Sequence, residues 1–440
     1  MGSQDIVWTP PVFRVSRKPT LVHKACLLPD THFTENFARS AKWCPDGSLA
    51  LAHCENRTLQ YLDITQELFN STLPQPGIVP PFDPPKIRIF PQAAPILDFI
   101  WYPRATPRDA SSFCFIASVR ESPVRLLDAS DGRLRASYKI VDHRERQIAP
   151  SSLAFNVPAD KLYCGFEDAI EVFDLSCPGS GTRLATTPSK KSRDGLKGII
   201  SALAFCPVND PSYRLFAAGS LSPSSSNSSN IALFDEDTGG KPIGWIGNIK
   251  ASVTQLAFNP MKPHILYASF RRRDEICAWD LRGDTVTPLQ TFRRDDGRGQ
   301  TNQKMKFDID LGGNLLGVGG QNGKISVFEL VGDLTESAEE AGAEVALSSM
   351  NVAPALEYHA HDDAVGSVAF HPLHPLLLAV SGSRHFDPIG VEEESPGSDS
   401  SITDEVPRGD GQVSIRRHRY RPQPSFRDNS FSLWHGESMS

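Results

Sequence analysis

One pattern of apolar and polar positions recurs along the whole chain, at intervals of 49 to 63 residues. Each copy is a short alternating strand that ends in an aromatic residue and a turn containing Pro or Gly. A strand of small residues follows, as in LFAAGS (215–220), and then a third strand that usually ends in an acid, as in LFD (233–235). Such alternation between turn residues predicts half-buried β-strands. The seven repeated aromatics are Trp43, Trp101, Phe155, Phe205, Phe258, Phe307 and Phe370.

Repeats of this length, each with a weaker fourth strand such as 134–140, 182–187 or 288–292, are typical of a β-propeller. The seventh repeat has no fourth strand after Trp434. We therefore expect a segment near the N-terminus, 12–16 or 21–28, to complete the last blade and remove its free edge. The predicted fold is all-β: a single seven-bladed WD-repeat β-propeller closed by an N-terminal strand.

The same pattern predicts the organisation of the chain. Residues 1–30 supply the closing strand, and residues 31–386 form blades one to seven. Residues 387–429 form a low-complexity insert in blade seven, acidic at first and basic later. Residues 430–440 are the last propeller strand and a tail.

Composition narrows the class of protein. The chain has 440 residues, of which 39% are hydrophobic, enough for a substantial core. Its eight cysteines form no CxxC pair, so we expect neither a zinc site nor a disulfide framework. The apolar runs are too short to cross a bilayer and no secretory leader opens the chain, which predicts a protein of the cytosol or nucleus. A net charge of −7 requires any nucleic-acid surface to be local.

Motifs for catalysis, metals and phosphate are weak. The glycine-rich stretch 319–325 lacks the first Gly and the final Ser or Thr of a phosphate loop. His359 and His361 occupy the loop where WD repeats commonly place a structural histidine, and His371 and His374 flank prolines in a turn. A metal site at these histidines is conceivable, but no nucleophile–base spacing accompanies them. We expect no enzyme, no cofactor, no metal and no small-molecule substrate.

The loops that join second to third strands, together with those that enter each innermost strand, share one face of a propeller, here called the top face. On this face basic side chains outnumber acidic ones. Arginine binds phosphate oxygens with two hydrogen bonds and stacks on bases, which suits RNA. The alternative is an ordinary polar loop surface that binds peptides. The candidate RNA-binding residues are Arg120, Arg144, Arg146, Lys190, Lys191, Arg193, Arg271, Arg272, Arg273, Arg293, Arg294 and Arg384.

A second hypothesis comes from Trp279-Asp280-Leu281-Arg282, which matches the WDxR box that substrate receptors present to cullin ubiquitin ligases. The same four residues end the third strand of many propellers, where the arginine covers the opposite, bottom face.

The sequence between the blades resembles the telomerase Cajal body protein family. The similarity runs in order across 31–386 and returns at 430–434, and it includes features outside the generic repeat, such as Thr34-Glu35-Asn36-Phe37, Arg120-Glu121 and Thr301-Asn302-Gln303. The similar segments are 33–48, 118–145, 164–173, 197–207, 272–282, 300–330 and 374–386.

This resemblance implies a non-catalytic scaffold that binds small nuclear or guide RNAs, of the small Cajal body RNA or telomerase RNA type, together with proteins of these ribonucleoproteins. It implies a nuclear location, in Cajal bodies or nucleoplasm, with the cytoplasm as a second compartment, and no membrane partner. Yeast relatives are linked to spliceosome assembly, which leaves a peptide-binding scaffold in mRNA splicing as an alternative. We expect a fungal-type member without the long N-terminal extension of the animal proteins.

Overall fold

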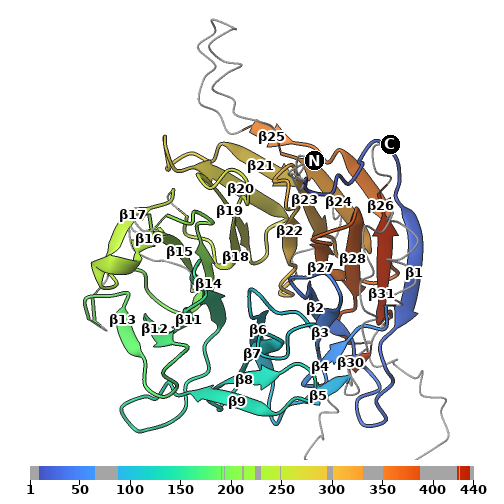
Figure 1. The fold of residues 1–440 in the computed structure, drawn as a ribbon. Coiled ribbons are helices and arrows are strands. Elements are labelled where there is room, and N and C mark those ends of the chain that lie inside the picture. Colours follow the sequence, from blue (N-terminus) through green and yellow to red (C-terminus); the bar gives the residue numbers. More distant parts are fainter. Residues whose placement is uncertain are drawn as a thin grey trace, which may run out of the picture.

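The structure is a computed structural model, and it describes residues 9–64, 88–189, 191–192, 194–210, 213–222, 229–247, 249–294, 301–330, 350–386, 424–425 and 427–436. Within these residues, seven antiparallel sheets surround a central axis, with β2, β6, β14, β18, β22 and β27 nearest to it (Figure 1). The predicted seven-bladed propeller is confirmed.

The first four blades each consist of four consecutive strands. Blade one contains β2 (Ala38–Trp43), β3 (Ala50–Cys54), β4 (Thr58–Tyr61) and β5 (Ile89–Pro91). Blade two contains β6 (Ile96–Trp101), β7 (Cys114–Val119), β8 (Val124–Asp128) and β9 (Leu134–Tyr138). Blade three contains β10 (Ser152–Phe155), β11 (Lys161–Phe166), β12 (Ala169–Asp174) and β13 (Thr182–Ala185). Blade four contains β14 (Ile200–Phe205), β15 (Leu215–Ser220), β16 (Ile231–Asp235) and β17 (Pro242–Trp245), with the 3-10 turn η1 (Glu236–Thr238) between the last two.

The remaining blades depart from this simple order. Blade five contains β18 (Val253–Phe258), β19 (Ile265–Phe270), β20 (Glu275–Asp280) and β21 (Gln290–Arg293). A fifth strand that the pattern did not predict, β25 (Met350–Val352), pairs in parallel with β21. Blade six contains β22 (Phe307–Ile309), β23 (Leu315–Gly319), β24 (Lys324–Glu329) and β26 (Leu356–His359).

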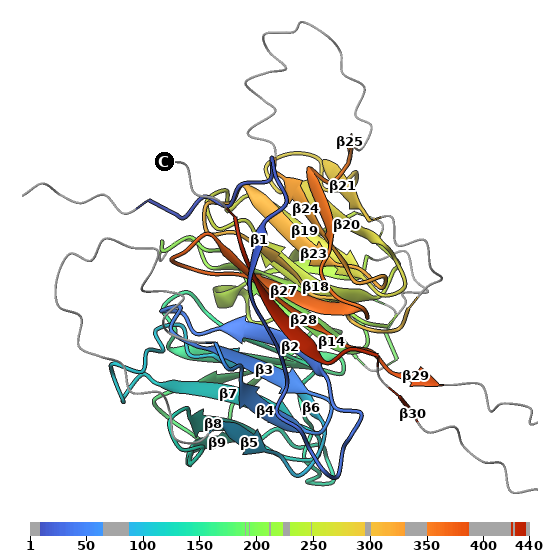
Figure 2. The same ribbon diagram turned by 90° about the vertical axis from the view of Figure 1, so that its right-hand side faces the viewer.

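Blade seven joins the two ends of the chain. It contains β27 (Val365–Phe370), β28 (Leu376–Ser381), β31 (Ser430–His435) and, at its outer edge, β1 (Thr20–Cys26), which pairs antiparallel with β31. Of the two N-terminal segments expected to close the ring, the structure uses the second. A short pair, β29 (His385–Phe386) and β30 (Pro424–Ser425), projects from one side of the ring (Figure 2). Most of the predicted insert, 387–423 and 426, lies outside the described residues.

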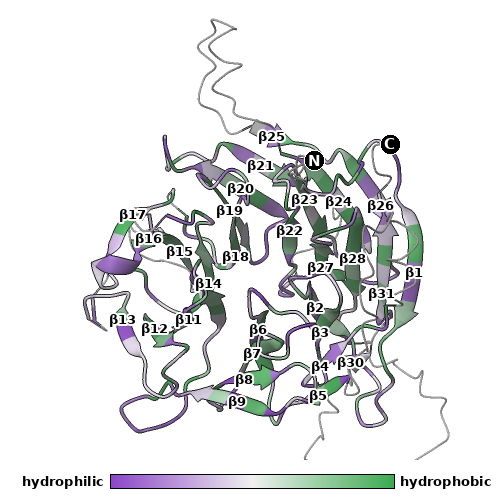
Figure 3. Ribbon diagram, in the orientation of Figure 1, coloured by the Kyte–Doolittle hydropathy of each residue, from purple (hydrophilic) through white to green (hydrophobic). Residues whose placement is uncertain are grey.

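The core lies between the blades. Among the described residues, buried apolar side chains form seven clusters, one for each pair of neighbouring blades. In Figure 3 the inner strands are correspondingly green, whereas outer strands such as β1 and β13 include purple, hydrophilic stretches. The repeated aromatics belong to these interfaces. Trp43 Nε1 donates to the carbonyl of Ala369 in blade seven at 3.1 Å, and Trp101 Nε1 donates to that of Lys42 in blade one at 3.2 Å. The repeat of one aromatic per innermost strand therefore packs each blade on its neighbour.

Side chains facing the central channel also link the innermost strands. Every neighbouring pair of blades shares a hydrogen bond between these strands or at their ends, so the ring is closed by polar contacts as well as by apolar packing. The contacts are Lys42 Nζ to Phe99 O, Leu153 N to Asp98, Ser152 Oγ to Ile200 O, Ser201 Oγ to Val253 O, Gln255 Nε2 to Phe307 O, Phe370 N to Asp308, and Ala41 N to Ser367 Oγ.

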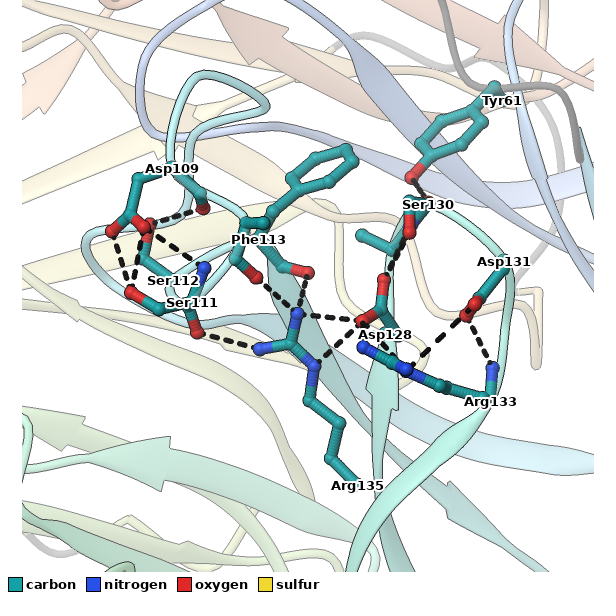
Figure 4. A network of polar contacts seen from close by, with 12 residues as sticks. Tyr61, Asp109, Ser111, Ser112, Phe113, Asp128, Ser130, Asp131, Arg133 and Arg135 are labelled. Carbon is teal, nitrogen blue, oxygen red and sulfur yellow. Dashed lines mark hydrogen bonds and ion pairs between the residues drawn. The ribbon is translucent and has the colours of Figure 1, made fainter.

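A buried ion pair fixes the bottom end of blade two (Figure 4). The carboxylate of Asp128, which is 4% exposed, accepts hydrogen bonds from Arg135 at 2.8 Å and from the Ser130 hydroxyl at 2.5 Å. Arg135 also donates to the carbonyl oxygens of Ser111 at 2.6 Å and Phe113 at 3.2 Å. The pair therefore fastens the loop after β6 to the end of β8.

Candidate functional site: the top mouth of the central channel

The central channel opens on the top face into a cavity of about 710 Å³, here called the channel mouth. Its wall includes four basic side chains, Arg39, Lys304, Lys306 and Arg384, and two carboxylates, Asp98 and Asp363. These residues come from strands and loops of several blades, because the loops that precede the innermost strands surround the top end of the channel. A second cavity of about 410 Å³ continues deeper in the channel past Lys42, Lys306 and Asp308.

The carboxylates in the mouth already have partners. Asp98 accepts the backbone N–H groups of Phe99 and Leu153 and lies 3.6 Å from Lys42 Nζ. Asp363 accepts the Ser383 hydroxyl at 2.8 Å and lies 2.9 Å from His385 Nε2. Ser383 Oγ is also 2.9 Å from Nε2 of the same histidine. A serine-hydrolase triad needs the base and its orienting carboxylate on opposite ring nitrogens, so this Ser–His–Asp cluster does not have that geometry.

The basic side chains differ in how far they are neutralised. Arg39 and Arg384 both pair with Glu55, one to each carboxylate oxygen. Within the described ranges, Lys306 Nζ donates only to the carbonyl of Thr254, at 3.1 Å. Burial, and next the charge of Lys304, lower the pKa of Lys306 to about 7. Lys306 is therefore only partly charged near neutral pH.

Lys304 is the least compensated cation of the mouth. Within the described part of the chain its ammonium group has no hydrogen-bond or ion-pair partner. Burial lowers its pKa; the carboxylate of Asp98 opposes this shift, while the charges of Arg271 and Arg39 add to it. An anion placed here would relieve this repulsion, so the arrangement suits a phosphate group.

The structure separates the predicted basic residues into exposed and engaged side chains. Arg120, Arg144, Arg146 and Arg271 are exposed, and none of their guanidinium groups has a hydrogen-bond or ion-pair partner in the described residues. Lys191 lies in the loop that enters β14, the innermost strand of blade four. Lys190 and Arg193 fall outside the described residues.

Most of the predicted arginines of blade five form hydrogen bonds or ion pairs within the protein. Arg272 donates to Asn302 at 2.7 Å, and Arg273 and Arg293 both pair with Glu275. Arg294 is only 9% exposed and donates to the carbonyl of Gly319 at 2.5 Å, which makes it a structural link to blade six. The run of arginines in the sequence is thus not one continuous free patch.

The alternative motifs have structural explanations. Gly323 belongs to the turn between β23 and β24, with φ of 79°, and a side chain there would collide with the carbonyl of His361. His361 is 1% exposed, and its ring nitrogens lie 3.0 Å from the hydroxyl of Ser430 and 2.7 Å from that of Ser432. It is thus a buried structural histidine that hydrogen-bonds to β31.

The Trp-Asp-Leu-Arg motif at 279–282 and His371 also have structural roles. Trp279 is fully buried and Arg282 pairs with Asp280 of its own turn at 2.8 Å. His371 lies 2.9 Å from the Gly47 carbonyl, and burial lowers its pKa to about 3. Across the described ranges, no group of three or more His, Cys, Asp or Glu side chains is placed to hold a metal ion, and no helix is long and apolar enough to cross a membrane.

Comparison with known proteins tests the resemblance seen in the sequence. No family model matches the chain. The telomerase Cajal body protein 1 of Bos taurus is 31% identical over 354 residues, which cover 80% of this chain and 59% of the relative. The human protein of that name is 29% identical over 370 residues, 84% of this chain and 61% of the relative. A Schizosaccharomyces pombe protein named guanine nucleotide-binding protein negative regulator 1 is 27% identical, over 66% of this chain and 70% of its own length.

The chain is a homologue of the telomerase Cajal body proteins. It spans about 60% of the length of these animal relatives, and the resemblance stated from the sequence is confirmed.

Several segments on which the sequence resemblance was based meet at the channel mouth. Phe37 and Arg39 come from 33–48, Thr301 to Lys304 from 300–330, and Ser383 to His385 from 374–386. Gln303 Nε2 donates to the Gly382 carbonyl at 2.9 Å, across the entry to the channel. Sequence reasoning missed Arg39, Lys304 and Lys306 as site residues, because they lie within or next to innermost strands rather than in long basic loops. The alternation of polar residues in KMKFDID (304–310) is the signal that places Lys304, Lys306 and Asp308 on the channel side.

Proposed function

We propose that this protein is a non-catalytic RNA-binding scaffold, which binds small nuclear or guide RNA across its top face and supports assembly or localisation of the ribonucleoprotein in the nucleus. The observation that carries the proposal is the group of like charges at the channel mouth. Among the described residues Lys304 has no hydrogen-bond or ion-pair partner; the Asp98 carboxylate favours its charge, and Arg271 and Arg39 raise the cost of that charge.

RNA phosphates meet the requirement of this group. Each phosphate brought to the rim neutralises a cation that is already partly desolvated, so it gains more than a phosphate on a solvated lysine would. Arg120, Arg144, Arg146 and Arg271 extend the positive surface outward on blades two and five. Contacts of this kind fix the position of an RNA without reading its sequence.

The homology supports the class of ligand and the compartment. The animal relatives are named for telomerase and for Cajal bodies, and a ribonucleoprotein in a nuclear body matches an RNA-binding propeller with ribonucleoprotein proteins as partners. Small Cajal body RNA, telomerase RNA and spliceosomal RNA are the RNA classes to be distinguished.

The test is ultraviolet crosslinking of the full chain in cells, followed by sequencing of the bound RNA. We expect enrichment of small nuclear or guide RNA over its abundance, and loss of that enrichment in an Arg271→Gln/Lys304→Gln double variant. Recovery of abundant RNA in proportion to its concentration would overturn the proposal. Copurification of a cullin and its adaptor, without enriched RNA, would instead favour the ubiquitin-ligase hypothesis.

A further inference from the structure

A smaller cavity of about 280 Å³ adjoins the channel mouth and shares Arg39, His53, Ile96 and Arg384 with it. Its other walls come from the segment before β2 and from the turn between β3 and β4, including Phe33, Asn36 and Arg57. We call this cavity the Phe33 pocket. It lies beside the proposed phosphate-binding rim, within reach of the same RNA strand.

Two features of the Phe33 pocket could serve a ligand: an exposed aromatic ring and a side-chain donor without a hydrogen-bond partner. Phe33 is 42% exposed, and among the described residues only one other aromatic side chain, Tyr213 on the bottom face, is similarly exposed. The guanidinium carbon of Arg57 lies 6.0 Å from the Phe33 ring centroid. Asn36 is 4% exposed, yet its buried Nδ2 has no hydrogen-bond partner. An unpaired buried donor is costly, and an occupant that accepts a hydrogen bond from Nδ2, once the amide turns to expose this atom, would remove this cost.

The pocket is held in place before any ligand arrives. Asn56 Nδ2 donates to Asp30 at 2.8 Å, and Asn56 N donates to Asn36 Oδ1 at 3.0 Å. Glu55 N donates to the Phe37 carbonyl at 2.9 Å. These bonds fix the segment before β2 on blade one, so the free Nδ2 of Asn36 has a defined position. A pre-ordered pocket loses little conformational entropy on binding.

We propose that the Phe33 pocket binds one unpaired RNA nucleobase. The base stacks on the Phe33 ring, with Arg57 alongside, and a carbonyl or ring nitrogen of the base accepts the Asn36 Nδ2 hydrogen bond. Phosphates flanking this nucleotide then lie in the adjoining channel mouth, where Lys304 has no hydrogen-bond or ion-pair partner among the described residues. The inference rests on the proposed RNA-binding function and adds to it the site at which a base is recognised, since stacking on aromatic and arginine planes is the usual way in which proteins read splayed-out RNA bases.

Other occupants fit less well. A free phosphate would not use the exposed phenyl ring or the apolar walls formed by Pro95 and Ile96, and Glu55 already pairs with the two arginines of the pocket. A peptide could use the ring, but it would leave the cations of the adjoining mouth without a ligand. A nucleotide satisfies the ring, the donor and the cations together.

The test measures binding of fluorescent single-stranded oligouridylate and oligoadenylate to the full chain over a range of salt concentrations. Phe33→Leu keeps the apolar surface but removes the aromatic face, and we expect affinity to fall roughly 5- to 150-fold, the range of one lost base stack, with the salt slope unchanged. Asn36→Asp keeps the oxygen that receives Asn56 N–H but replaces the donor, so the ratio of the two dissociation constants should change. Tyr213→Leu is the matched control and should stay within about twofold of wild type.

The outcomes separate this inference from the proposed function. If wild-type protein binds neither oligonucleotide nor any cellular RNA, the proposed function fails. If wild-type protein binds RNA and Phe33→Leu and Asn36→Asp bind it equally well, the pocket assignment alone is wrong. Unchanged RNA affinity with loss of a copurifying protein would overturn the assignment in favour of a peptide. Retained melting temperatures in both variants exclude unfolding as the cause of a loss, and a 4-thiouridine crosslink to a peptide containing Phe33 would support the site directly.

Discussion

The double variant Arg271→Gln/Lys304→Gln tests whether the channel mouth contacts RNA phosphates. Both side chains lack a hydrogen-bond or ion-pair partner within the described residues, so replacing them leaves no opposite charge uncompensated and should preserve the fold. Each phosphate contact with single-stranded RNA contributes about 0.7 to the slope of log K against log salt. Loss of two contacts should therefore flatten the slope by about 1.4.

The expected loss of affinity follows from the same slope. If the binding constant extrapolated to 1 M salt is unchanged, the variant should bind about 15-fold more weakly at 0.15 M salt and about 65-fold more weakly at 0.05 M salt. Fluorescence anisotropy with one oligonucleotide at five or so salt concentrations measures both quantities. Preference among RNA sequences should remain, because phosphate contacts carry no base information.

A matched control removes the same amount of charge from the bottom face. Arg104 and Arg108 are exposed in the loop after β6, and neither guanidinium group has a partner among the described residues. Arg104→Gln/Arg108→Gln should leave the slope as in wild type. If this control flattens the slope as much as the channel-mouth variant does, net charge rather than a site explains binding; if the channel-mouth variant keeps the wild-type slope, the proposed contacts do not exist.

The remaining predictions concern stability. Arg135→Met leaves the buried Asp128 carboxylate without its main cation and should lower the free energy of urea unfolding by about 3–5 kcal/mol. Arg133→Met, whose side chain is 72% exposed, should cost less than about 1 kcal/mol. Equal losses would refute the assignment. Burial opposes ionisation of Asp128, but hydrogen bonds from Ser130 and Arg135 outweigh it and lower its pKa from 3.8 to about 2. Its contribution, about 2 kcal/mol, should be complete above pH 3.8 and disappear as pH falls toward 2, and acid titration of Asp128→Asn should lack this component. Deletion of residues up to 26 removes β1 and exposes the edge of β31, so we expect aggregation in size-exclusion chromatography, which a monodisperse product would contradict.

The local sequence determined the blades of this protein. Each innermost strand alternates and, in every blade except blade six, ends in an aromatic residue; β22 of blade six begins with Phe307 and ends at Ile309. A turn rich in Pro, Gly or Asp follows, so strand positions depend on short-range periodicity and turn chemistry. The missing fourth strand after Trp434 was enough to predict closure by an N-terminal segment, because an unpaired edge must be covered. The parallel strand β25 could not be predicted, since it extends blade five from a point in the chain 60 residues after its partners in β21, with Met350 paired to Gln290.

The tertiary structure alone decided which cations are available. Arg294 stands in a basic run of the sequence, yet it donates a hydrogen bond to the Gly319 carbonyl in the neighbouring blade. Lys304, by contrast, borders an innermost strand and lines the mouth with no hydrogen-bond or ion-pair partner in the part of the chain that the structure describes. Likewise, Phe33 and Asn36 line a common pocket only because hydrogen bonds hold the segment before β2 against the turn between β3 and β4. Burial and pairing depend on contacts between blades that are distant in sequence, and a charge pattern read along the chain contains no information about them.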